Sequence, residues 1–153
     1  MPNVEIDQSG KMEDLARDTV LAFSNGVQRA IRIPAAVKRN VVRYLRQKDK
    51  SKTRAAVLLF SAALFLLLRE ALEHIDQIVI DVEYEGYEDE IKGWLLSRIY
   101  QVDPGFDKTR VKFQRVGKKS PAHQLALAVF RDQKPPDQVI TEQVLLGVLS
   151  EKK

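Results

Sequence analysis

Two carboxylates stand two residues apart where a strongly apolar segment ends. Asp81 and Glu83 follow the apolar residues 78–80, and in an extended chain residues i and i+2 point to the same side. Carboxylates placed in this way can bind hard divalent cations through oxygen. They can equally close a strand and lead into a solvated acidic loop, because more acids follow at residues 85–90.

Two further side chains with ligand chemistry lie in different contexts. Asn25 precedes Gly26, and Asn-Gly is the preferred pair for a two-residue hairpin turn, which explains Asn25 without any function. Its amide carbonyl is nevertheless a neutral oxygen ligand. His123 follows Ser120-Pro121, a typical helix start. It is either a surface residue of that helix or an imidazole ligand, which suits Mn²⁺ or Zn²⁺ better than Mg²⁺.

An alternation of strands and helices is expected to position these residues. Residues 19–24 and 27–33 predict a hairpin around Asn25-Gly26, whereas residues 1–17 carry little periodicity and are expected to form a mobile N-terminal arm. Residues 40–47 fit either a helix or a third strand. Further helices are expected at 54–73, 88–99, 121–131 and 141–149, and further strands at 75–84 and 110–116.

Composition narrows the classes of protein. The chain has 153 residues, which fits a single domain at 18–150 after the arm. It contains no cysteine, so disulfides, thiolate zinc sites and cysteine nucleophiles are excluded. The polar and acidic start does not resemble a secretory signal, and we expect a cytoplasmic protein.

The apolar run at residues 55–68 is too short to span a bilayer. We therefore expect no membrane partner and a helix that is buried on every side. Other elements of the chain or a second subunit must cover such a helix, so a homodimer is one expectation.

Basic residues are clustered although the net charge is only +4. One cluster lies between residues 27 and 54 and another between 108 and 119, and such clusters either attract phosphates or form an ordinary solvated surface. The candidates for nucleic-acid contacts are Arg29, Arg32, Lys38, Arg39, Arg43, Arg46, Lys118 and Lys119.

The order of the elements and four short strings resemble the ribonuclease H-like superfamily. Its first strand ends in a Thr-Asp-Gly-Ser string, and residues 23–26 offer Asn25 in place of the aspartate. Its central helix carries a glutamate where residues 54–57 offer Ala56. The next strand keeps its acid at Asp81, with Trp94 in the following helix, and the last helix offers His123 in place of an aspartate.

This resemblance, over residues 18–130, implies an α/β fold with a ribonuclease H-like mixed sheet. The sheet would have a three-strand antiparallel meander followed by parallel strands, with helices on both faces. The meander then favours the strand interpretation of residues 40–47. The resemblance also implies a catalytic site for Mg²⁺ or Mn²⁺, with Asp81 and His123 as metal ligands and Asn25 as a neutral helper. The strand geometry adds Glu83 to this set as a second carboxylate ligand.

Three functions follow from these expectations. The first is a nucleic-acid-binding ribonuclease H-like domain with a degenerate metal site, catalytically weak or inactive, because Asn25, Ala56 and His123 replace acids. The second is an atypical divalent-metal-dependent nuclease or resolvase that acts through Asp81, Glu83 and His123. The third is a homodimeric interaction protein without a nucleic-acid role. The sequence does not distinguish RNA from DNA as the partner.

Overall fold

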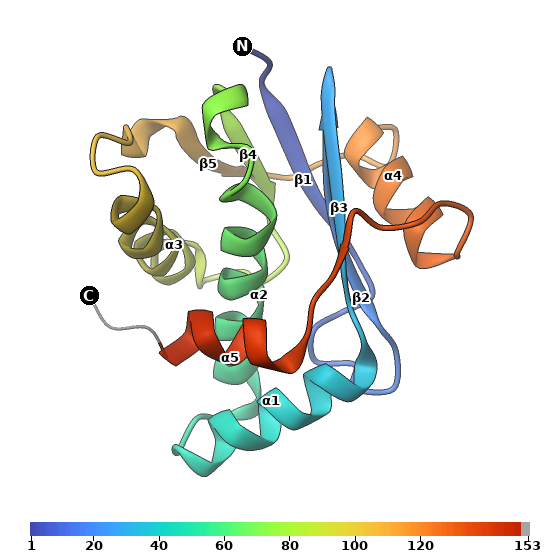
Figure 1. The fold of residues 1–153 in the computed structure, drawn as a ribbon, viewed down its shortest axis with the longest axis vertical. Helices are drawn as coiled ribbons and strands as arrows, with labels where there is room; N and C mark the ends of the chain where they lie inside the picture. Colours follow the sequence, from blue (N-terminus) through green and yellow to red (C-terminus); the bar gives the residue numbers. More distant parts are fainter. Residues whose placement is uncertain (151–153) are drawn as a thin grey trace.

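The chain forms an α/β fold around one mixed sheet of six strands, as the computed structural model shows for residues 1–150 (Figure 1). The strands are β1 (Val4–Ser9), β2 (Thr19–Asn25), β3 (Val27–Ile33), β4 (Ile78–Asp81), β5 (Val111–Gln114) and β6 (Gln138–Val139). The helices are α1 (Ala35–Gln47), α2 (Lys52–Leu68), α3 (Glu88–Val102), α4 (Pro121–Phe130) and α5 (Glu142–Ser150). The general α/β class expected from the sequence is confirmed.

The sheet has the order β5-β4-β1-β2-β3-β6. Strands β1, β2 and β3 form an antiparallel meander, and β4 lies parallel to β1, with β5 parallel to β4. The predicted hairpin is confirmed, because β2 and β3 join at Gly26, whose φ of 82° suits glycine. The carboxyl ends of β1, β4 and β5 therefore meet at one edge of the sheet.

The prediction of a mobile arm at residues 1–17 is wrong. Strand β1 lies inside the sheet between β2 and β4, and Val4 and Ile6 belong to the core. Residues 4–9 read Val-Glu-Ile-Asp-Gln-Ser, so polar residues dilute the apolar pattern. Pairing on both sides compensates, since the strand exchanges hydrogen bonds with two neighbours.

The expected third strand at residues 40–47 is also wrong, because this segment lies within helix α1. Val41, Val42 and Leu45 are buried on one side of the helix, which is the spacing of an amphipathic helix. The meander still exists, but β1 is its first strand and the predicted hairpin supplies the other two. The prediction therefore began the meander at β2, one strand later than the structure does.

Helices cover both faces of the sheet. Helix α4 packs on β1 and β2 through a small cluster that includes Ala22 and Ala126, whereas the larger core lies on the opposite face around α2. Helix α2 contacts the sheet, α1, α3 and α5 (Figure 1). Its burial is thus provided by its own chain and gives no argument for a second subunit. No helix among residues 1–150 is long and apolar enough to cross a membrane.

Candidate metal centre

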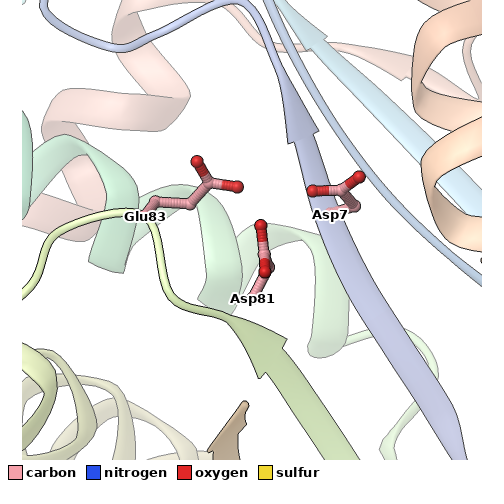
Figure 2. A group of neighbouring side chains, drawn as sticks. All are labelled: Asp7, Asp81 and Glu83. Atoms are coloured by element: carbon pink, nitrogen blue, oxygen red, sulfur yellow. The ribbon is translucent and has the colours of Figure 1, made fainter. Parts of the chain in front are cut away.

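Two carboxylates from adjacent parallel strands and a third from the loop after β4 converge at the carboxyl edge of the sheet. Asp7 lies on β1, Asp81 ends β4 and Glu83 follows two residues later, and one oxygen of each lies within 4.8 Å of the others (Figure 2). The register explains the meeting of the aspartates. Ile6 pairs with Ile80 and both belong to the larger core, so the next residue of each strand faces the α4 side.

Asp7 is held by contacts on both of its oxygens. Its Oδ1 accepts a hydrogen bond from the Gln8 backbone N–H at 2.9 Å, and its Oδ2 lies 2.6 Å from Nδ1 of His123 on α4. Only 5% of Asp7 is exposed. Burial raises the pKa of this carboxyl, against the opposing effects of Gln8 and His123. The position of Asp7 is thus fixed from the strand and from the helix.

Asp81 is held by a backbone contact, and Glu83 is set apart by its raised pKa. Oδ1 of Asp81 accepts a hydrogen bond from the Val116 backbone N–H at 2.7 Å, which ties β4 to the loop after β5. The pKa of Glu83 is raised to about 9, first by burial and then by contact with Asp81 and by the charges of Asp81 and Asp7. At neutral pH the group therefore retains a proton that a divalent cation would displace.

The predicted ligand set is partly brought together. Asp81 and Glu83 lie in the cluster, and His123 lies beside it against Asp7. Asn25 lies elsewhere. Asp7 pairs with Ala22 of β2, and Asn25 is three residues further along that strand, a distance of about 10 Å. The Asn25 amide donates to the Asn3 carbonyl at 2.7 Å. Asn25 ends β2 and pairs with Val27, so Gly26 alone forms the turn, and the expectation that Asn25 is a central residue of a two-residue turn is wrong.

Sequence reasoning missed Asp7, which lies in the segment interpreted as an arm. Its signal was the alternation of Val4, Ile6 and the polar residues between them, followed by Gly10. Ala56, which stands where the resemblance places an acid, is buried in α2 and carries no ligand atom. The cluster therefore contains three carboxylates from β1 and from the end of β4.

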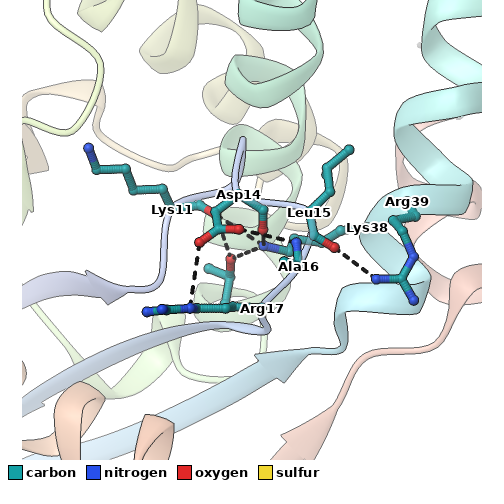
Figure 3. A network of polar contacts seen from close by, with 8 residues as sticks. Lys11, Asp14, Leu15, Ala16, Arg17, Lys38 and Arg39 are labelled. Carbon is teal, nitrogen blue, oxygen red and sulfur yellow. Dashed lines mark hydrogen bonds and ion pairs between the residues drawn. The ribbon is translucent and has the colours of Figure 1, made fainter.

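Several of the predicted nucleic-acid contacts have structural roles instead. Lys38 is 0% exposed, and its Nζ donates to the Lys11 carbonyl at 3.0 Å, the Asp14 carbonyl at 2.6 Å and Thr19 Oγ1 at 2.9 Å (Figure 3). This amine fastens the loop between β1 and β2 and is not accessible to a phosphate. The prediction for Lys38 is therefore wrong.

Two arginines of β3 are also engaged within the chain. Arg32 forms ion pairs with Asp18 at 2.8 Å and Asp132 at 2.9 Å, and Arg29 donates to Gln138 Oε1 at 2.8 Å. Both are only partly exposed. The candidates that remain exposed are Arg39, Arg43 and Arg46 on α1, and Lys118 and Lys119 before α4.

Comparison of the chain with protein-family models, with curated proteins and with solved structures finds no match. The functional argument therefore depends on the geometry of the carboxylate cluster and on the distribution of charge.

Proposed function

We propose that this chain is a divalent-metal-dependent nuclease that hydrolyses phosphodiester bonds at the cluster of Asp7, Asp81 and Glu83. The observation that carries the proposal is the convergence of three carboxylates within 4.8 Å at the carboxyl edge of a mixed sheet. Ligands of open α/β sheets commonly bind at this edge.

The donor set fits Mg²⁺ or Mn²⁺. All three residues offer carboxylate oxygens, the ligands that these hard cations prefer. Burial and then the neighbouring acids Asp81 and Asp7 raise the pKa of Glu83, and a cation would offset the cost of holding these carboxylates ionised together. A bound metal of this kind would activate water and neutralise charge on the phosphate.

His123 supports the cluster from the neighbouring helix. Its contact with Asp7 Oδ2 fixes the direction of that carboxylate, as outer partners of metal ligands generally do. The side chain is 25% exposed, so the imidazole also borders solvent where a substrate would approach. We assign His123 the role of positioning Asp7.

The loop between β5 and α4 connects the cluster to positive charge. The Val116 N–H binds Asp81, and the same loop exposes Lys118 and Lys119 before α4 begins. Two lysines beside an acidic metal centre would attract the phosphates of a nucleic acid to it. This arrangement favours a polyanionic substrate over a small neutral one.

The likeness to a ribonuclease H-like domain remains part of this proposal. An antiparallel meander followed by parallel strands, with an acid on the first strand and another at the end of the fourth, agrees with that type of site. Asp7 takes the place that the sequence resemblance had given to Asn25. The departure is Ala56, which leaves the central helix without a carboxylate.

Cleavage assays with the intact chain test the proposal. Hybrid, duplex and branched substrates are incubated with Mg²⁺ or Mn²⁺, and wild type is compared with Asp7→Asn and Asp81→Asn. We expect each variant to lose at least about 100-fold in cleavage rate, because each removes a metal ligand. The matched control is Asp49→Asn, since Asp49 is exposed and has a φ of 64° that asparagine tolerates. Equal rates in Asp7→Asn and wild type would contradict the assignment.

Ala56 favours a second candidate, a nucleic-acid-binding domain without catalysis. Without a carboxylate at position 56 of the central helix, the cluster can bind one cation and still lack the ligands for a second cation. Metal-independent binding together with no cleavage of any substrate in either metal would establish this second candidate over the first.

A further inference from the structure

Helix α1 presents a stripe of arginines to solvent. Arg39, Arg43 and Arg46 are exposed, and their spacing of four and three residues places them on one side of the helix. The stripe extends about 10 Å along the axis, a length that faces about three phosphates of one strand. The opposite side of the helix, with Val41, Val42 and Leu45, is buried in the core.

The stripe has no counter-charge among residues 1–150. Arg39 donates to the Leu15 carbonyl at 2.8 Å, which leaves its charge unpaired, and neither Arg43 nor Arg46 forms an ion pair with a described carboxylate. Beyond α1 the chain continues with basic residues at 48, 50, 52 and 54 against Asp49, and of these Arg54 forms an ion pair with Glu90 at 2.9 Å. Positive charge therefore accumulates at this end of the molecule.

A chain of contacts connects the stripe to the carboxylate cluster. Tyr84, next to Glu83, accepts a hydrogen bond from the Met12 N–H at 3.3 Å and donates to Glu13 at 3.2 Å. The same loop, residues 10–18, reaches α1 through the contact of Leu15 with Arg39 (Figure 3). The loop contains acids as well as bases, so it does not itself form a basic surface. It lies between the α1 stripe and the carboxylate cluster.

We propose that the outer face of α1 is a second nucleic-acid contact, which binds the sugar-phosphate backbone of a double-stranded arm away from the bond that is cut. This inference rests on the proposed function for the class of ligand and deepens it. The carboxylate cluster performs the chemistry, and the α1 stripe holds the flanking duplex. The contact is independent of base sequence.

The character of the stripe favours a nucleic-acid duplex over other polyanions. A membrane-surface helix needs an exposed apolar side, whereas the apolar side of α1 is buried. Single strands are usually held by exposed aromatic rings. The one aromatic residue of α1, Tyr44, is only partly exposed and lies under Lys48 Nζ, 5.2 Å from the ring centroid. Among residues 1–150, the arginines of the α1 stripe therefore have no aromatic rings beside them for base stacking, and their guanidinium groups suit the phosphates of a duplex backbone.

The test is the salt dependence of binding, measured by fluorescence anisotropy in EDTA so that no cleavage occurs. Labelled DNA and RNA duplexes of equal length are titrated with wild type, with Arg43→Gln/Arg46→Gln and with Arg131→Gln/Lys134→Gln. The first variant removes two charges from the stripe without removing a hydrogen bond. The second removes two exposed charges after α4 and is the matched control.

For Arg43→Gln/Arg46→Gln, we expect the slope of log affinity against log salt to become shallower by about 1.8, because each lost phosphate contact changes it by about 0.9. The control should keep the wild-type slope. DNA and RNA duplexes should show the same decrease, since the contact is to the backbone.

An unchanged slope in Arg43→Gln/Arg46→Gln, or an equal decrease in the control, would overturn the α1 proposal. Binding of wild type to phosphatidylserine vesicles with no binding to duplexes would also overturn it. Asp7→Asn separates the two proposals, because it should lose cleavage and keep the wild-type slope. If wild type cleaves nothing while Arg43→Gln/Arg46→Gln still reduces the slope, the nuclease proposal fails and the α1 contact stands.

Discussion

The protein withdraws ionisable side chains from solvent in two places, at Lys38 and at the carboxylate cluster, and their surroundings differ. The Lys38 amine is inaccessible, and two carbonyls of the loop between β1 and β2 and the hydroxyl of Thr19 at the start of β2 accept its hydrogen bonds. The cluster of Asp7, Asp81 and Glu83 collects three acids with no cationic side chain among its ligand atoms. A buried charge whose hydrogen bonds are satisfied stabilises the structure, whereas acids that share one partly buried site are costly to ionise together and are a candidate for function.

The largest expected effect is stabilisation by a divalent metal, which should depend on the carboxylate cluster and not on Lys38. Adding Mg²⁺ or Mn²⁺ at about 100 times the dissociation constant should stabilise wild type by about 2.7 kcal/mol, because the cation binds only the folded cluster. Thermal unfolding with increasing metal measures this. Asp7→Asn/Asp81→Asn should show no metal-dependent shift, while Lys38→Met should keep it. A full shift in the Asp7→Asn/Asp81→Asn variant would remove the distinction.

Lys38→Met should lower the free energy of unfolding by about 1–3 kcal/mol. The thioether occupies a similar volume but leaves the carbonyls of Lys11 and Asp14 without their buried donor. Urea denaturation measures the loss. Arg43→Gln, at an exposed position of the same helix, is the control and should stay within about 0.5 kcal/mol of wild type. If Lys38→Met is as stable as wild type, the hydrogen bonds from Lys38 do not stabilise the loop.

Glu83→Gln should have the opposite sign and raise the free energy of unfolding by more than about 1 kcal/mol at pH 8. The pKa of Glu83 is raised to about 9, so the folded state holds a proton that the unfolded state releases near its ordinary pKa of 4.5. Wild-type stability from this group is present at low pH and is lost as pH rises toward 9. Glutamine removes this dependence, which urea denaturation at pH 5 and pH 8 in EDTA can measure. A variant that loses stability at pH 8 would contradict the repulsion argument.

A further expected effect is a rise of stability in alkali from Lys38. Burial lowers the pKa of its amine to about 8, so between pH 8 and about 10.5 the unfolded chain holds more protons than the folded one. The free energy of unfolding therefore increases with pH across this window through Lys38. The slope should be absent in Lys38→Met. Identical slopes in the two proteins would show that this amine does not titrate there.

The sequence predicted elements whose pattern is local. The Asn25-Gly26 hairpin, the buried helix α2 and the helix after Ser120-Pro121 depend on neighbouring residues, and the structure confirms all three. Strand β1 was missed because its stability depends on pairing with β4, more than 70 residues away along the chain. Residues 40–47 fit a helix or a strand by their own pattern, and the resemblance favoured the strand because the meander lacked the strand that β1 supplies.

The candidate site was predicted in part for the same reason. Asp81 and Glu83 are two residues apart, so their common direction could be inferred from strand geometry alone. Asp7 enters the cluster only through the register of β1 against β4. The engagement of Lys38 and Arg32 within the fold likewise depends on tertiary contacts, which a run of basic residues does not reveal.

The central place of β1 has a consequence for synthesis of the chain. The strand is synthesised about 70 residues before its partner β4, and the contact of Asp7 with His123 spans 116 positions. Contacts at such separation form late in folding. Until residue 78 is available, the nascent meander exposes the unpaired edge of β1, with Val4 and Ile6 on it. A fragment that ends before β4 is therefore expected to aggregate through this edge.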